Sequence, residues 1–318
     1  MKHLMHSLNA SAGSASESDK KFRHRPFSVV GIAENQLRTR IMTAIIGIPV
    51  VLLAILLGLS GIAVLSISAG IIGGLELDHM MRPTIDRPNR WDGTRIISLA
   101  FGPIAIAVFG AWMLSEGRIT GEHLPILLAL VLTLALLVRG TAMLGRSGGS
   151  SIPGRRAGDW VYWVFAAYVG LSLAHAPVTV GLSNGRELLL LAIVTTFAID
   201  SSALLVGLSM GRTQLVPKIS PNKSWEGAVG GLIGGATVAI GIDAAFDLQF
   251  STAAAGVLGA VLGVAAILGD LYESWIKRRS SVKDSGSIIP GHGGILDRLD
   301  SVMPNLVVVY WAAVWNAL

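Results

Sequence analysis

Long apolar runs are the feature that most constrains this chain. Runs of about fifteen to twenty mostly apolar residues recur through its 318 residues, and only 14% of the residues are charged. Soluble domains carry about 25% charged residues, so an excess of this size (52% hydrophobic, mean hydropathy +0.63) cannot be hidden in one soluble core. The pattern predicts an all-α polytopic integral membrane protein and excludes a soluble enzyme of two ordinary domains.

Each apolar run has roughly the twenty residues that a helix needs to cross a bilayer. We expect about nine transmembrane helices, at 41–58, 60–77, 96–114, 124–138, 160–174, 187–207, 227–242, 252–271 and 301–317. With the N-terminus in the cytoplasm, the cytoplasmic segments hold all of the 25 Lys and Arg residues except Arg118 and Arg186. The positive-inside rule therefore supports both this count and this orientation.

The polar, Ser-rich and basic residues 1–40 predict a disordered tail, followed by a membrane-embedded domain at 41–318 whose catalytic part is mainly 187–318. No apolar segment precedes the small residues Ala10 to Ala15, so a cleaved signal peptide is not expected. The absence of cysteine excludes disulfides, zinc-thiolate sites and cysteine nucleophiles. The net charge of +5 reports topology in a membrane protein, so nucleic acid is not an expected partner.

Acidic residues in or at the edge of apolar segments are costly and need a partner or a function. Glu76, Asp200, Asp270 and Glu273 are residues of this kind. The last two share one side of a helix with Ser274 and Lys277, because the spacing from Asp270 is i+3, i+4 and i+7. Such a stripe suits chemistry at the membrane surface, although an interfacial salt-bridge face gives the same pattern.

The connection after this stripe is rich in glycine around His292. Glycines allow the backbone to turn sharply, and a helix starting after Gly294 would aim free N–H groups at an anion such as phosphate. His292 could be a general base, a phosphate donor or a turn residue, and we favour a donor or positioning role. Asp297 and Asp300 supply the hard oxygen ligands that Mg²⁺ prefers, although compensation of the helix dipole would also place acids there.

A second polar connection, at 208–226, contains cations, hydroxyls and an amide just before a helix start. Its candidate binding residues are Ser220, Asn222, Lys223 and Glu226. Ser224 could instead be a helix N-cap, and Trp225 an anchor at the bilayer interface. Both long polar connections lie on the predicted cytoplasmic side, where a soluble substrate would arrive.

The stretch from Ser274 to Asp300 resembles the signature of the phosphatidate cytidylyltransferases, also called CDP-diacylglycerol synthases. It reads S-x-[apolar]-K-R, four residues, K-D, and then [PG]-x-H-G-G-[apolar]-x-D-R-[apolar]-D, with every fixed position present. The block from Pro217 to Gly227 also resembles the family, and a looser similarity runs from about residue 39 to the C-terminus. The chain departs from the family at Asp200-Ser-Ser202-Ala-Leu204, where a Gly and a Tyr are missing.

The resemblance implies that CTP and phosphatidic acid react to give CDP-diacylglycerol and pyrophosphate. It also implies Mg²⁺ held by Asp270 and Asp297 with Asp300, a possible second cation, and phosphates clamped by Lys277, Arg278, Lys283 and Arg298. Asp284 and His292 complete the expected catalytic set, with Gly293 and Gly294 as a phosphate cradle. The expected substrate-binding residues are Ser220, Asn222, Lys223, Glu226, Ser274 and Asp200. A homodimer in a bacterial plasma membrane, with its site facing the cytoplasm, is expected on the same basis.

The same residues leave three alternatives open. A related lipid nucleotidyltransferase or lipid kinase would use another acceptor lipid, which the sequence discriminates poorly. An ion-coupled transporter would place carboxylates near the bilayer centre, whereas most here lie at one membrane face. An inactive scaffold is disfavoured because the whole signature is intact.

Overall fold

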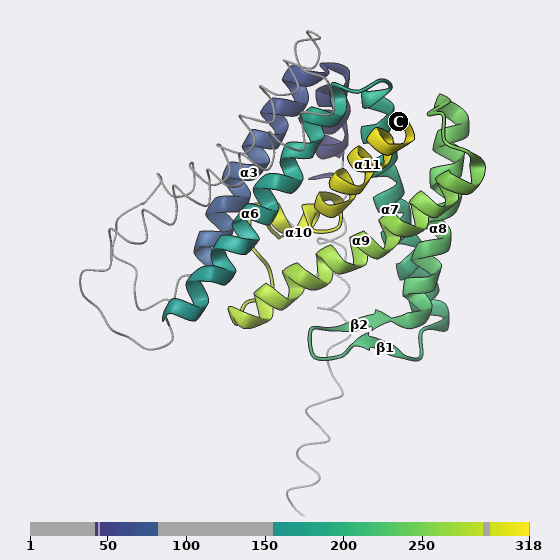
Figure 1. Ribbon diagram of the computed structural model, residues 1–318. Coiled ribbons are helices and arrows are strands. Elements are labelled where there is room, and N and C mark those ends of the chain that lie inside the picture. The colour runs from purple at the N-terminus through teal and green to yellow at the C-terminus, as the bar shows by residue number, and fades with distance from the viewer. Residues whose placement is uncertain (1–41, 44, 82–154, 289–292, 318) are drawn as a thin grey trace, which may run out of the picture.

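The protein is mainly helical in the computed structural model, which describes residues 42–43, 45–81, 155–288 and 293–317 (Figure 1). Its labelled helices and strands are α3 (Leu59–Met81), α6 (Arg155–Val180), α7 (Gly185–Met210), β1 (Gln214–Val216), β2 (Ser220–Ser224), α8 (Trp225–Phe246), α9 (Thr252–Arg279), α10 (Leu296–Leu299) and α11 (Val302–Ala317). The predicted tail 1–40, the predicted spans 96–114 and 124–138, and His292 lie outside the described residues.

Four of the described helices are long and apolar enough to cross a membrane: residues Leu59–Leu77 of α3, and α7, α8 and α9. Shorter apolar helices cover Ile45–Leu56, Val164–Val180 and Val302–Asn316. Each of these segments overlaps a predicted span, which confirms a membrane protein of helical class. Large apolar side chains such as Leu205 and Leu208 are exposed on α7, as a surface in contact with lipid requires.

The described part of the protein is mainly helical, as the sequence predicts, but the connection between α7 and α8 also forms a short antiparallel hairpin that was not expected. Gln214 pairs with Ser224 and Val216 with Ser220. β1 has only three residues, and β2 is polar and contains Pro221, so neither strand shows the alternation of apolar and polar residues that would reveal it in the sequence. The hairpin lies at the end of the molecule where α7 ends, α8 begins and α9 ends (Figure 1).

Glycine allows α8 to pack closely against both α7 and α9. A Cβ atom at Gly230 would lie 2.5 Å from Cγ2 of Val206 on α7. A Cβ atom at Gly259 of α9 would lie 2.6 Å from Cα of Ala236, and one at Gly235 would lie 2.7 Å from the carbonyl oxygen of Gly259. Small residues of this kind let helix backbones approach one another in a membrane.

The C-terminal helix α11 packs against α6, α7 and α9, and α6 in turn packs on α3. One polar contact in this core joins α11 to α7: Nδ2 of Asn305 donates to Oγ1 of Thr196 over 2.8 Å, with both side chains buried. This arrangement brings the loop that precedes α10 against the end of α3.

Candidate active site

The acidic stripe of α9 lies on one face of the helix, as its spacing predicts. Oγ of Ser274 donates to Oδ1 of Asp270 over 3.1 Å, across one helical turn. The other oxygen of Asp270 lies 2.7 Å from Nζ of Lys223, which stands on β2. This ion pair connects the hairpin to α9, so two segments predicted separately to bind substrate meet here.

Lys277, one turn further along α9, connects the helix to the signature loop. Its Nζ lies 2.8 Å from Oδ1 of Asp297 and 3.5 Å from Oε2 of Glu273. The second oxygen of Asp297 accepts hydrogen bonds from the backbone N–H and the hydroxyl of Ser285, both over 2.9 Å, and from the N–H of Gly294 over 2.8 Å. Burial would raise the pKa of Asp297, but the hydrogen bonds from Lys277 and Gly294 outweigh it and hold the pKa below its ordinary value.

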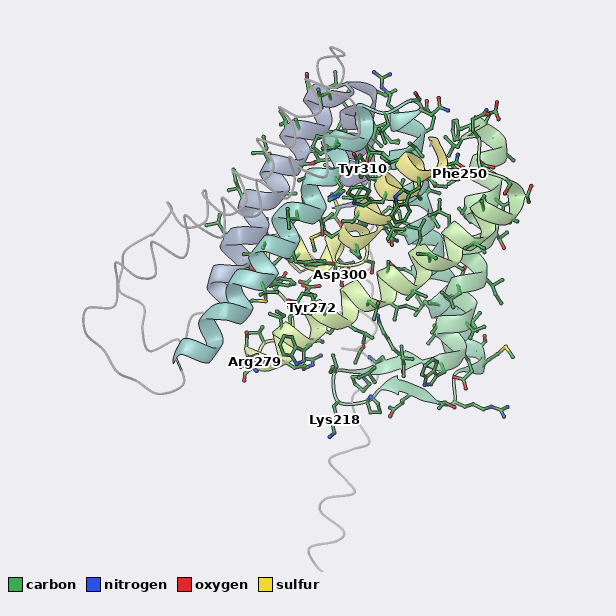
Figure 2. All side chains as sticks on the ribbon, viewed as in Figure 1. Lys218, Phe250, Tyr272, Arg279, Asp300 and Tyr310 are labelled. Carbon is green, nitrogen blue, oxygen red and sulfur yellow. The ribbon has the colours of Figure 1, made fainter. Side chains whose placement is uncertain are left out.

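Glu273 and Asp300 form the most buried part of this cluster. Glu273 is fully buried, and neither of its carboxylate oxygens accepts a hydrogen bond within the described part of the chain. The carboxyl group of Asp300 lies beside it, next to α9 in Figure 2. Burial, and then the negative charge of Asp270, raise the pKa of Asp300 above its ordinary value. Two adjacent carboxyl groups of this kind need a shared proton or a cation.

Asp200 of α7 lies close enough to this cluster for its carboxyl group to interact electrostatically with the charges of Asp300, Asp270 and Lys223. Its predicted association with the substrate site is therefore compatible with its position. The acids that come together are Asp200, Asp270, Glu273, Asp297 and Asp300, against the lysines Lys223 and Lys277 and the nearby Arg298. The cluster thus contains more carboxylates than cations, and we name it the acidic cluster.

Other predicted site residues hold structural positions or stand apart from the acidic cluster. Nε of Arg278 donates to the carbonyl of Ile219 over 3.3 Å, which joins the end of α9 to the hairpin. Glu226 accepts the backbone N–H groups of Arg212 and Thr213, each over 3.2 Å, and so stabilises the turn before β1. Asn222, Lys283 and Asp284 are exposed, and Ser220 is half-buried.

The glycines of the signature loop make room for carboxylates. Gly293 has a φ of +82°, in the left-handed region, and a Cβ there would lie 2.7 Å from Oδ2 of Asp297. The N–H of Gly294 donates to Asp297, and the N–H groups of Ile295 and Leu296 donate to Glu76. The backbone donors that we expected to be free for a phosphate are therefore occupied by acidic side chains.

Glu76, Glu273 and Ser285 are not among the site residues that the sequence predicts, although the structure places all three beside those residues. Two of them carried a signal, because Glu76 and Glu273 are acids at the ends of apolar runs. Ser285 carried none, since a serine in a polar loop is unremarkable in a sequence.

The acidic cluster fits a hard divalent cation by the chemistry of its donors. Carboxylate oxygens are the ligands that Mg²⁺ prefers, and the buried oxygens of Glu273 lack a hydrogen-bond donor. As the side chains stand, Asp270 pairs with Lys223 and Asp297 with Lys277, and no group of three or more His, Cys, Asp or Glu among the described residues is arranged to hold a metal ion. Cation binding would therefore displace at least one lysine.

Comparisons with known proteins agree with the signature. Residues 38–315 match the cytidylyltransferase family. A Pseudomonas aeruginosa protein named phosphatidate cytidylyltransferase is 34% identical over 242 residues, which cover 71% of this chain and 85% of the relative. A Brucella abortus protein of the same name is 33% identical over 279 residues, covering 87% and 93%.

Mycobacterial relatives with this name match over a shorter region. The Mycobacterium leprae protein is 40% identical over 145 residues, which cover 46% of each chain. The match to the Mycobacterium bovis protein, at 36% identity, covers 52% of this chain and 54% of the relative. The chain therefore spans about half the length of these mycobacterial relatives, but it matches the family along most of its own length. On the extent of that match, the chain belongs to the cytidylyltransferase family.

Proposed function

We propose that the protein is a phosphatidate cytidylyltransferase, which converts CTP and phosphatidic acid to CDP-diacylglycerol and pyrophosphate. The observation that carries the proposal is the convergence of β2, α9 and the signature loop through the Lys223–Asp270 and Lys277–Asp297 ion pairs. The bacterial relatives named phosphatidate cytidylyltransferase support the same activity.

The reaction joins two anions, and this determines what the site must do. An oxygen of the lipid phosphate attacks the α-phosphorus of CTP, and the bond from that phosphorus to the β-bridging oxygen breaks, so pyrophosphate leaves with the bonding electrons. A phosphate monoester has a second pKa of about 6, so it is already largely ionised and requires no strong general base. Catalysis must therefore neutralise charge and align the reactants.

The lysines of the acidic cluster are placed for this work. Lys223 and Lys277 are each oriented by an aspartate, at 2.7 and 2.8 Å, so their ammonium groups are positioned before substrate arrives. Arg298, whose charge acts on Asp200, would add a further cation for phosphate oxygens. Lys283 and His292 of the signature would complete the phosphate contacts, and Arg278 would keep the hairpin beside α9.

Asp270, Asp297 and Asp300 would hold Mg²⁺. Because the acidic cluster has more carboxylates than cationic side chains, it could also accommodate a second cation. When bound, the metal would neutralise triphosphate oxygens and the departing pyrophosphate. Lys223 and Lys277, released from their aspartates, would then be available to the phosphates.

We further propose the nine-span topology, with the N-terminus and the site facing the cytoplasm of a bacterial plasma membrane. Of the Lys and Arg residues that the structure describes, all except Arg186 belong to segments at the end of the molecule that carries the hairpin and the acidic cluster. The positive-inside rule assigns that end to the cytoplasm. The homodimer is proposed from the family resemblance alone.

The activity is tested by incubating purified protein in detergent with phosphatidic acid, Mg²⁺ and one of the four nucleoside triphosphates. A liponucleotide and pyrophosphate should form with CTP or dCTP only, and a chelator should abolish their formation. Phosphorylation of the lipid with ATP would identify a lipid kinase instead. Product formation with another acceptor lipid but not with phosphatidic acid would change the proposed substrate.

A further inference from the structure

A buried carboxylate from a distant part of the chain reaches the signature loop. Glu76 lies near the end of α3 and is only 3% exposed. Its Oε1 accepts the backbone N–H of Ile295 over 2.9 Å, and its Oε2 accepts the N–H of Leu296 over 3.0 Å. These partners lie 219 and 220 residues away in the sequence. The hydrogen-bond partners of this buried acid are therefore backbone N–H groups just before Asp297.

Ser285 connects this carboxylate to Asp297. Ser285 is 1% exposed, and its hydroxyl lies 3.2 Å from Oε2 of Glu76 and 2.9 Å from Oδ2 of Asp297. Three consecutive backbone N–H groups are divided between the same two acids, since Gly294 donates to Asp297 while Ile295 and Leu296 donate to Glu76. A displacement of Glu76 would therefore move the groups that orient Asp297.

Two glycines leave the space that Glu76 occupies. A Cβ atom at Gly286 would lie 2.7 Å from Oε1 of Glu76, and one at Gly294 would lie 2.5 Å from Oε2 and in still closer contact with Oγ of Ser285. Both distances are too short for any side chain to be tolerated without movement. The loop is thus shaped around this one carboxylate on both sides.

We infer that Glu76 is a positioning residue for the proposed reaction, because it holds Ser285 and residues Gly294–Leu296 and thereby fixes the carboxylate of Asp297 within the acidic cluster. Within the part of the chain that the structure describes, Glu76 reaches Asp297 through Ser285 and the loop backbone, so we assign it a positioning role and not a catalytic one. The kinetic part of this inference rests on the proposed function, whereas the holding of the loop does not.

The test uses Glu76→Gln in the full-length protein, with hydrogen exchange and kinetics measured on the same preparation. Glutamine keeps the size of the side chain but only one accepting oxygen. Exchange of the Ile295 and Leu296 amides should rise by roughly tenfold to a hundredfold. Because a displacement of about 1 Å can cost a hundredfold in rate, kcat should fall by roughly that factor, with little change in KM for CTP.

Asp243→Asn is the matched control. Asp243 is also a carboxylate that accepts a backbone N–H, from Phe250 over 3.2 Å, but it lies near the C-terminal end of α8, whereas the hairpin precedes the N-terminal end of that helix. This variant should speed exchange near Phe250 and leave both turnover and the exchange of Ile295 unchanged. Glu76→Leu distinguishes packing from hydrogen bonding, because a residue that only fills space would tolerate leucine.

Wild-type exchange and kcat in Glu76→Gln would overturn the inference. If that variant cannot be purified folded, Ser285→Ala removes only the bridging hydroxyl and should cost about tenfold in kcat; an unchanged rate there would also overturn it. If the wild-type protein forms no liponucleotide, the proposed function fails, while the exchange measurements still decide whether Glu76 holds the loop.

Discussion

Glycine serves opposite purposes in the helix bundle and in the signature loop. Where α8 crosses α9, Gly235 and Gly259 bring two backbones into contact, and the neighbours are carbonyl oxygens and Cα atoms. In the loop, Gly286, Gly293 and Gly294 make space for the carboxylates of Glu76 and Asp297. A side chain added in the bundle would push helices apart, whereas one added in the loop would displace acids that orient the site.

Stability and turnover should therefore respond differently to similar substitutions in these two regions. Bundle glycines should affect the free energy of unfolding, because helix packing in the membrane depends on close backbone approach. Loop glycines and acids should affect turnover first, because the loop buries little apolar surface but positions Asp297. Four substitutions test this separation.

The largest expected effect is that of Asp297→Asn. An amide nitrogen accepts no hydrogen bond, so asparagine cannot keep both the three hydrogen bonds that Oδ2 accepts and the contact of Oδ1 with Lys277 at 2.8 Å, and its neutral side chain ends the ion pair. CTP-dependent turnover should fall by roughly a hundredfold to a thousandfold, measured as liponucleotide formation by folded protein. Asp247→Asn, at an exposed helix C-cap, should retain full turnover. Retained turnover in folded Asp297→Asn would remove this residue from the proposed site.

Gly294→Ala should come next. The new methyl group would meet Oε2 of Glu76 at 2.5 Å, and would approach Ser285 more closely still, so the loop must shift. We expect turnover to fall by roughly tenfold or more while the thermal unfolding temperature changes little. The control is Gly241→Ala on α8, where a Cβ meets nothing within 4 Å. Equal turnover in the two variants would show that the loop tolerates the displacement.

Gly259→Ala should reverse this pattern. Its Cβ would lie 2.6 Å from Cα of Ala236, and two helix backbones cannot adjust as a side chain can. Overpacking of this kind costs about 1–3 kcal/mol, which should lower the unfolding temperature in detergent. Turnover by the protein that remains folded should be preserved. If turnover were lost and stability kept, the division between bundle and loop would be wrong.

The smallest expected effect is that of Ser224→Ala. Oγ of Ser224 accepts the N–H of Gly227 over 3.1 Å and caps α8. Loss of an N-cap costs about 1 kcal/mol, so a small decrease in unfolding temperature is expected, with turnover close to that of the wild type. Ser209→Ala is the comparison, because that exposed hydroxyl bonds only within its own helix. Equal stability of the two variants would argue against a stabilising cap.

The sequence predicted what depends on local spacing. The stripe of Asp270, Ser274 and Lys277, the positions of the described apolar helices, and the alternative reading of Ser224 as an N-cap follow from periodicity and neighbouring residues, and the structure confirms them. The metal and phosphate roles assigned to the signature residues remain predictions.

What the sequence did not predict depends on contacts between distant segments. The hairpin at 214–224 is held partly by Arg278 of α9 and has no strand periodicity of its own. The pair of Glu76 with the loop joins residues more than two hundred positions apart. An acid at the end of an apolar run announces that a partner is needed, but nothing in a single sequence says which residue it is.

The long-range bond of Glu76 has a consequence for biogenesis. Ile295 is made 219 residues after Glu76. At synthesis rates of about 5–20 residues per second, Glu76 is therefore made roughly ten to forty seconds before the backbone N–H of Ile295 that donates to it. During that interval Glu76 lacks the backbone donors and the Ser285 hydroxyl that it contacts in the folded protein. Closure of the loop on Glu76 would thus mark the late moment at which the newly made polypeptide becomes mature.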